Sequence, residues 1–277
     1  MVSSRTTLLV CLVAAFFAVS LAAQTNPVLF PRFGISGGGY LTDFGTTLRV
    51  DPHVEGLQGT SIDLERDLGL TSSKTLTRAG IEWRPFDRHE IDLAYFRTQR
   101  RGNLNINKQI VYEDTTFPIN ANVRSRFDID YWDLSYTYWA RKAANDGLGV
   151  NIGVMGMSFN GELNASVAGI SATLQQDAKA KIPLPVIGVE GRWAIGSHIA
   201  TTLRGSFLPE VSFKDYKGQA YLGRASAEYD IGQWLGLGLG YNYLKLNGSA
   251  DKTNFHADLD MSVRGLEGFV HLVFGGR

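Results

Sequence analysis

The histidines of this sequence, together with nearby serines and carboxylates, are the residues that could support catalysis. Hydrolysis by an activated nucleophile requires a serine, a histidine and an orienting acid within hydrogen-bonding distance of one another. His256, Asp258, Asp260 and Ser262 alternate along one segment, and in an extended strand they would share one face. Such a row could polarise a water molecule, but it is also what the ordinary polar, inward face of a strand looks like. We favour the second interpretation and predict no catalytic residues.

Three carboxylates in the segment 59–70 could bind a metal ion. Asp63, Glu65 and Asp67 offer the oxygen ligands that a hard cation such as calcium accepts. They alternate with leucine and isoleucine, however, and no glycine-turned twelve-residue loop surrounds them. A short capped turn explains the apolar residues better, so we predict neither a metal site nor any other cofactor.

Two neighbouring segments carry a cluster of arginines that would meet if the segments form a hairpin. The cluster consists of Arg97, Arg100, Arg101, Arg124 and Arg126. Guanidinium groups form bidentate contacts with phosphate, so one hypothesis is that these residues contact phosphorylated lipid. The alternative is pairing with carboxylates of the same hairpin, namely Glu113, Asp128 and Asp130.

The elements that must position these groups are strands, because alternation of apolar and polar residues is the dominant pattern. Residues 235–243 place Leu and Tyr at every odd position and mostly Gly at every even one. Large apolar side chains on one face and small or polar ones on the other are typical of a strand in a membrane-spanning barrel. The pattern predicts ten strands, with eight to twelve possible, at about 33–50, 73–86, 88–106, 118–142, 148–165, 171–196, 198–212, 217–231, 234–249 and 255–274.

The connections between these strands mostly alternate in length, which favours a barrel over a soluble sandwich. Those near residues 87, 144, 196 and 232 are short, whereas those near 51–72, 107–117 and 249–254 are longer. Short turns on one side and longer loops on the other are typical of an outer-membrane barrel with both termini in the periplasm. The fold class is therefore predicted to be an all-β, antiparallel, up-and-down transmembrane barrel.

Tryptophans lie close to the four short turns. They are Trp83, Trp139, Trp193 and Trp234, and only Trp132 lies elsewhere. Indole rings concentrate where a membrane meets water, so we expect these four to form a girdle at one membrane interface.

Charged residues of both signs occupy the positions predicted to face the interior. They are Arg78, Glu82, Arg84, Glu190, Arg192, Arg224, Glu228 and Asp230. Four positive and four negative groups in a narrow lumen would pair, since an unpaired buried charge is costly. We expect a polar interior that is largely plugged.

Two strands change the phase of their alternation. The apolar residues move from odd to even positions after Tyr131 and shift again near Gly265. One expectation is a β-bulge that restores a continuous polar face. The alternative is that the outer halves of these strands stand above the membrane, where facing is unconstrained.

The N-terminus predicts export. Residues 1–22 combine Arg5 with an apolar run that is too short to span a membrane as a helix, and small residues precede Ala23. This is the pattern of a cleaved signal peptide, leaving residues 23–277 as the barrel domain. The only cysteine, Cys11, lies in the signal, so the mature chain would contain no thiol.

The signal, the glycine-rich segment 34–40 and the closing aromatic Phe274 resemble the outer-membrane barrel superfamily of OmpA-like and OmpW-like proteins. The segment 59–70 resembles a loop of uncharacterised members. The sequence ends with Gly275-Gly276-Arg277, three residues past the closing aromatic. It differs in this respect from the usual terminal phenylalanine, which is the signal recognised during barrel assembly. We expect the chain to lie in the outer membrane of a Gram-negative bacterium, with outer-membrane lipids, lipopolysaccharide and the barrel-assembly machinery as its partners.

The net charge argues against nucleic-acid binding. Removing Arg5 from the 27 basic residues leaves 26 against 27 acidic ones, so the chain has no general attraction for nucleic acid. We expect a non-enzymatic barrel with a membrane-integrity or surface-interaction role. The alternatives are a narrow conduit for small or apolar solutes, which the OmpW-like resemblance implies, and a lipid-modifying enzyme that uses His256.

Overall fold

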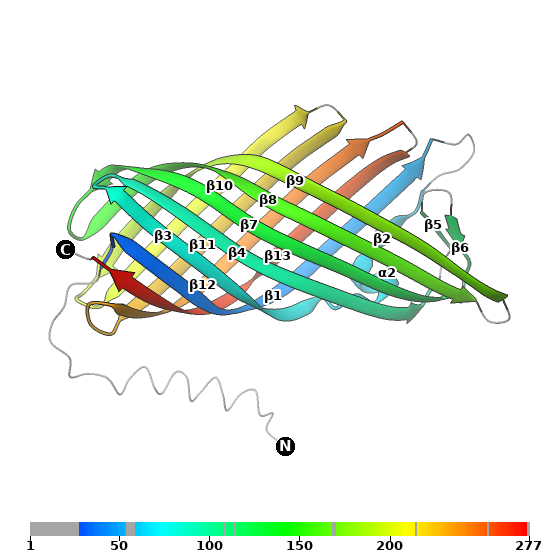
Figure 1. Ribbon diagram of the computed structural model, residues 1–277, viewed down its shortest axis with the longest axis horizontal. Coiled ribbons are helices and arrows are strands. Elements are labelled where there is room, and N and C mark those ends of the chain that lie inside the picture. Colours follow the sequence, from blue (N-terminus) through cyan, green and yellow to red (C-terminus); the bar gives the residue numbers. More distant parts are fainter. Residues whose placement is uncertain are drawn as a thin grey trace, which may run out of the picture.

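Ten long antiparallel strands form a closed ring in the computed structural model (Figure 1). The structure describes residues 28–53, 59–107, 109–112, 115–167, 170–213, 215–253 and 255–275. The ring strands are β1 (Phe33–Pro52), β3 (Ser73–Phe86), β4 (His89–Asn105), β7 (Asn122–Lys142), β8 (Asp146–Val167), β9 (Ile170–Ile195), β10 (Ile199–Phe213), β11 (Tyr216–Asp230), β12 (Leu235–Asp251) and β13 (Phe255–Phe274). Each pairs with its neighbour along the chain, and β13 closes the ring on β1. The predicted fold class is confirmed. The predicted signal peptide, Ala23 and Cys11 lie outside the described residues.

The connections alternate between the two ends of the barrel as the sequence predicts, although at the opposite end those between β8 and β9 and between β10 and β11 are also short. Four short turns, after β3, β7, β9 and β11, lie at one end of the barrel, called here the short-turn end. The first residue of β1 pairs with the last of β13, Phe33 with Phe274, so this end also holds both ends of the ring (Figure 1). The opposite end is called the loop end.

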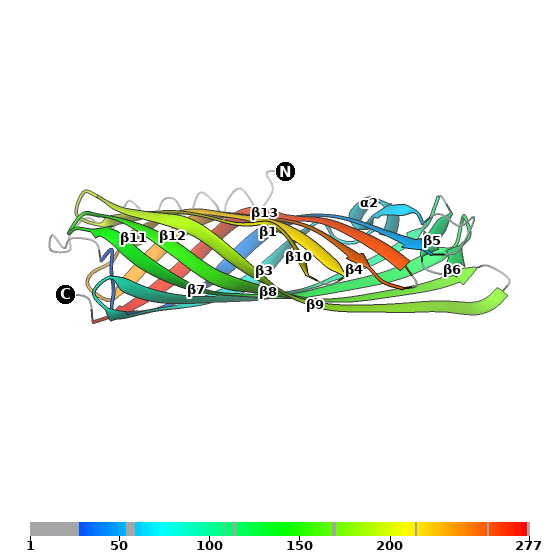
Figure 2. The same cartoon turned by 90° about the horizontal axis from the view of Figure 1, so that it is seen from above.

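Four short elements stand at the loop end (Figures 1 and 2). They are β2 (Ser61–Asp63), α2 (Leu64–Leu68), β5 (Ile110–Tyr112) and β6 (Thr115–Phe117). The Asp63 carboxylate caps α2 by accepting from the Arg66 N–H at 2.9 Å. Gly69, at φ 66°, ends the helix in a left-handed conformation that glycine adopts without strain. No helix in the described ranges is long and apolar enough to cross a membrane.

The outside of the ring carries an apolar belt. On β7 the outward residues are Trp132, Leu134, Tyr136 and Tyr138, all more than one-third exposed. Towards the loop end the next outward residue on this strand is charged, Asp130. An apolar band of this kind, bordered by polar residues, is the surface that a transmembrane barrel presents to lipid.

The inside of the ring is divided into two layers. The layer nearer the loop end is apolar, and it is called here the apolar plug. It consists of Tyr40, Phe44, Leu76, Phe96, Ile129, Tyr131, Met155, Met157, Phe159, Leu184, Val186, Leu208, Ala220, Leu244, Leu246, Met261 and Val263. The layer at the short-turn end is charged, and the expectation of a polar lumen is therefore wrong for the loop-end half.

This division explains the two phase changes without a bulge. The register between β7 and β4 is continuous from Asn122 to Tyr138, and Ile129 and Tyr131 point inward on the same face as Ser135. On β13, buried positions likewise follow one odd-numbered series from Met261 to Val273. The predicted bulge at Tyr131 and shift at Gly265 are wrong, because the inward face changes from apolar to polar while its phase stays the same.

A second apolar cluster lies above the plug. It combines residues of β2, α2 and the loop-end parts of the barrel, namely Val50, Ile62, Leu64, Leu68, Leu70, Ile106, Ala121 and Val123. The leucines of segment 59–70 are therefore a cap folded over the loop end, as the sequence indicates.

Candidate functional site

The charged layer at the short-turn end, called here the charge network, is centred on Arg192. Its Nε donates to Glu190 Oε1 at 2.8 Å, and its guanidinium also donates to Glu90. The guanidinium lies 4.8 Å from the ring of Trp139, whose indole N–H donates to Glu90 at 3.2 Å. Arg192 is therefore held by carboxylates and by a cation–π contact in a site that excludes most solvent.

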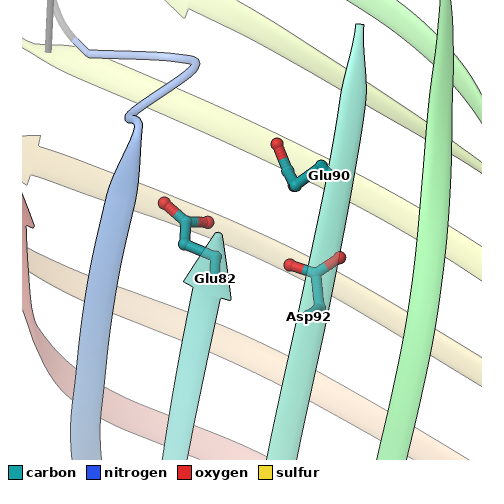
Figure 3. A group of neighbouring side chains, drawn as sticks. All are labelled: Glu82, Glu90 and Asp92. Carbon is teal, nitrogen blue, oxygen red and sulfur yellow. The ribbon is translucent and has the colours of Figure 1, made fainter. Parts of the chain in front are cut away.

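Three carboxylates of the charge network come together on neighbouring strands. Glu82 lies on β3, and Glu90 and Asp92 lie on β4 (Figure 3). One oxygen of each lies within 4.8 Å of the others, a donor set that suits a hard metal ion. The guanidinium of Arg192, however, already lies among them, 3.8 Å from Glu82. The arrangement is an arginine-centred ion cluster.

A second centre is Glu267, which is 2% exposed. It accepts from Arg78 at 3.2 Å and from the Asn242 amide at 2.8 Å, and it lies 3.5 Å from Arg224. One carboxylate therefore serves two guanidinium groups. The hydrogen bond from Asn242 fixes its orientation between them.

His271 forms a third centre. Its Nδ1 lies 3.0 Å from Glu228 and its Nε2 lies 3.3 Å from Glu82, so both ring nitrogens face carboxylates. Both nitrogens can donate to these groups only when the ring is protonated.

All eight charged residues predicted to face the interior do so. Sequence reasoning missed five other members, which are Glu90, Asp92, Arg204, Glu267 and His271. The signal for Glu90 and Asp92 was present, because they alternate with outward Ile91 and Leu93. Glu267 was hidden by the phase change expected at Gly265.

A cavity of about 210 Å³ lies between the charge network and the plug. Its polar lining includes Arg78, Arg224 and Asp133, and its apolar lining includes Tyr40 and Tyr131 from the underside of the plug. A polar cavity of this size is large enough to hold several water molecules.

The arginine cluster predicted near the loop end is split between the two faces of the wall. Arg97 pairs with Asp130 at 3.2 Å and Arg126 with Asp128 at 2.6 Å. Arg100 points inward instead and is completely buried. The predicted lipid contact is therefore wrong for Arg100.

The contacts of Arg100 explain its inward position. It pairs with Glu65 and donates to the hydroxyl of Thr46 at 3.0 Å, so it ties the loop-end cap to the barrel wall. Arg101 and Arg124 are exposed on the outer face and form no ion pair within the described ranges. Glu113, the other partner that the sequence offered, lies outside those ranges.

The three carboxylates of segment 59–70 form contacts within the protein. Asp63 caps α2, Glu65 binds Arg100, and Asp67 accepts from the Asp63 backbone N–H at 2.9 Å. All three side chains therefore have a structural role.

His256 lies on the outer face of β13 and not in the lumen as expected. It is exposed and contacts Asp258 at 3.2 Å, while Asp258 and Asp260 also face outward. The expectation that this row lines the lumen is therefore wrong, because inward positions on β13 are odd-numbered.

The tryptophans near the short turns fall into two groups. Trp83, Trp193 and Trp234 are 51%, 43% and 62% exposed on the outer surface, and they are called here the girdle tryptophans. Trp139 is fully buried and packs edge-on against Phe30 at 4.9 Å. Its predicted place in the girdle is wrong, because it lies on the inward face of β7 and contributes to the charge network.

Comparisons with known proteins identify the fold. No protein-family model matches the sequence, and no curated protein matches it. The crystal structure of outer membrane protease OmpT from Escherichia coli is similar at a TM-score of 0.58 with 13% identity, covering 87% of this chain and 97% of that one. This match supports an outer-membrane barrel fold and does not transfer an activity at such low identity.

Two further solved structures are matched less well. The translocator domain of autotransporter NalP from Neisseria meningitidis has a TM-score of 0.42 with 9% identity, covering 95% of this chain and 96% of that one. The Pseudomonas putida toluene transporter TodX has a TM-score of 0.33 with 8% identity, covering 90% and 92%. The neighbours are outer-membrane barrels, and none of them confirms the narrower OmpA-like or OmpW-like resemblance.

Proposed function

We propose that this protein is a non-enzymatic, non-conducting barrel of the Gram-negative outer membrane that contributes to membrane integrity through its outer surface. The observation that carries the proposal is the apolar plug. Its side chains come from strands all round the ring and meet in the middle of the lumen. A barrel that is closed inside must act through its exterior, its rims or its loops.

The packing of the plug argues against a conduit. The rings of Phe96 and Tyr131 stack at 4.6 Å, and Tyr40 packs edge-on against Phe96 at 6.1 Å. Ile129 and Met155 are fully buried beside them. Contacts of this kind exclude ions and water. Barrels of about eight strands are narrow enough for side chains to fill, so a ring of ten leaves little room.

In this proposal the short-turn end faces the periplasm and the loop end faces outward, as is usual for outer-membrane barrels. Arg97 and Asp130 then begin a polar band directly above the apolar belt, at the depth of lipid headgroups. Arg101 lies directly opposite Arg126 across the β4–β7 pair. Like charges placed opposite each other destabilise a sheet. Asp128 offsets the charge of Arg126, and an anion bound at Arg101 would remove the rest of this cost.

The outer leaflet supplies such an anion in the phosphates of lipopolysaccharide. Asp128 pairs with Arg126, whereas Arg101 and Arg124 form no ion pair with any described residue, so these two are the groups that we expect to bind phosphate. We therefore assign lipopolysaccharide contact to the band of Arg97, Arg101, Arg124 and Arg126.

The test is binding of purified lipid A to the barrel in detergent micelles, read by native mass spectrometry. The variant Arg101→Ala/Arg124→Ala should lose most of the bound lipid A, since each charge-assisted contact is worth about 1.5–3 kcal/mol. Removal of both phosphates from lipid A should have the same effect on the wild-type protein.

The matched control changes charge equally at the other end of the barrel. Arg88→Ala/Arg141→Ala removes two exposed arginines near the short turns and should leave lipid A binding unchanged. Equal loss in both double variants, or no loss in either, would contradict the assigned band.

A further inference from the structure

A short irregular segment crosses the mouth of the barrel at the short-turn end. It consists of Val28–Pro31 and is called here the strap. Arg192 donates to the carbonyl of Leu29 at 3.0 Å, and Arg84 donates to the carbonyl of Pro31 at 3.1 Å and to the carbonyl between them. Two arginines of the charge network therefore hold three consecutive backbone carbonyls. The strap is bound chiefly through its main chain.

The remaining contacts of the strap are equally specific. The N–H of Val28 donates to the Asp230 carboxylate at 2.7 Å. The ring of Phe30 packs against Trp139, and the Leu29 side chain is only 4% exposed. The buried tryptophan is thus part of a seat for the strap.

The seat is shaped by a glycine. A Cβ at Gly147 would lie 2.4 Å from the Phe30 ring, so any larger residue there would push the ring out of place. The ammonium of Lys142 covers the same ring at 5.3 Å.

The strap lines the cavity described above at its short-turn end. Val28, Leu29 and Pro31 all line that cavity, and the underside of the plug lines it on the other side. The cavity, called here the chamber, therefore lies between the plug and the strap. The plug is built from barrel strands, whereas the strap is a segment of four residues.

The lining of the chamber contains polar groups that have few or no polar partners among the described residues. The Asp133 carboxylate has no hydrogen bond or ion pair within the described ranges, and neither the Tyr40 nor the Tyr131 hydroxyl has a hydrogen bond there, although both rings are more than nine-tenths buried. Within the described ranges Arg224 lies 3.5 Å from Glu267 and 5.3 Å from the Phe269 ring, and its guanidinium has no hydrogen bond. Groups of this kind require water or a small polar solute as partner.

We propose that the strap is a removable closure, and that its release opens the chamber to small polar solutes from the short-turn end. Its main-chain contacts can be exchanged for water, and its apolar packing comes from a segment of only four residues, of which Leu29 and Pro31 are buried. Local opening of a segment this small costs far less than unfolding the barrel. The inference goes beyond the proposed function and would stand if lipid A binding failed.

The test measures solvent access to the chamber with a single cysteine. Cys11→Ser removes the only native thiol, and Ser226→Cys places a thiol of nearly the same size on the chamber wall. The folded protein in detergent is treated with a small cationic methanethiosulfonate, and labelling is followed by mass spectrometry. The strap is weakened by Leu29→Ala/Phe30→Ala and, separately, removed by deleting Val28–Pro31.

Weakening the strap should speed labelling at position 226 at least about tenfold, because protection by a closure reflects its opening equilibrium. Ala144→Cys, on an exposed short turn, should label at one rate with or without the strap. A closed barrel changes its gel mobility on heating, and this change shows which variants fold. If the deletion variant does not fold, the Leu29→Ala/Phe30→Ala variant provides the test.

Two results would overturn the proposal. If position 226 labels as fast in the intact protein as in the strap variants, the strap is no closure. If it labels slowly in all of them while Ala144→Cys labels fast, another part of the barrel closes the chamber.

Discussion

Replacing Glu267 with alanine tests the energetic role of the charge network. Glu267 is 2% exposed and is the one carboxylate within 4 Å of both Arg78 and Arg224 in the described structure. Loss of one partner from a buried ion pair costs about 3–5 kcal/mol. Both guanidinium groups also face the chamber, where water can solvate them in part, so we expect about 3 kcal/mol, at the low end of this range.

The assay is equilibrium unfolding by guanidinium chloride in phospholipid vesicles, followed by tryptophan fluorescence and circular dichroism. Glu267→Gln keeps the shape and one acceptor, so its loss of stability should be smaller. The control is Asp260→Asn, which breaks the exposed pair with Lys245 and should cost less than about 1 kcal/mol. If Glu267→Ala is no less stable than this control, the chamber arginines do not depend on Glu267 and the described network is wrong.

Three further results are expected. Ile129→Ala should lower the free energy of unfolding by about 3 kcal/mol, because it leaves a cavity in the centre of the plug; a loss below that of a surface alanine variant would show that the plug is loosely packed. Brominated lipids should quench the fluorescence of single-tryptophan variants that retain a girdle tryptophan, and should leave the one that retains Trp139 unquenched; quenching of Trp139 would contradict its inward position. At the short turn after β3, the Lys142 ammonium holds the pKa of Asp87 below its usual range. This pair stabilises the fold above the ordinary carboxyl pKa and loses its effect as the pH falls through the lowered value. Lys142→Ala should raise the pKa of Asp87 in an NMR titration, and an unchanged pKa would refute the pairing.

The predicted strands agree closely with those observed because alternation and turn spacing are local properties of the chain. Each strand must place one face towards an apolar exterior, and this requirement repeats along 235–243 and its equivalents. The four short turns and the closing pair of β1 with β13 follow from the same regularity.

What the sequence did not reveal is where the interior changes from polar to apolar. If the lumen is assumed to be polar throughout, an inward tyrosine or isoleucine looks like a break in the apolar–polar alternation. For this reason the sequence wrongly predicted a bulge at Tyr131. The position of Trp139 depends on contacts with Arg192 and Phe30, which come from distant parts of the chain. The inward position of Arg100 depends likewise on Glu65 in the cap.

The central claim is that the plug closes the lumen, and planar-bilayer recording tests it most directly. Folded protein should insert without producing a stable open channel. A trimeric porin prepared in the same detergent is the positive control and should give its usual conductance steps. The strap deletion should also remain silent, because the plug persists when the strap is absent. A steady conductance of porin size from the wild-type barrel would contradict the account and would favour a conduit instead.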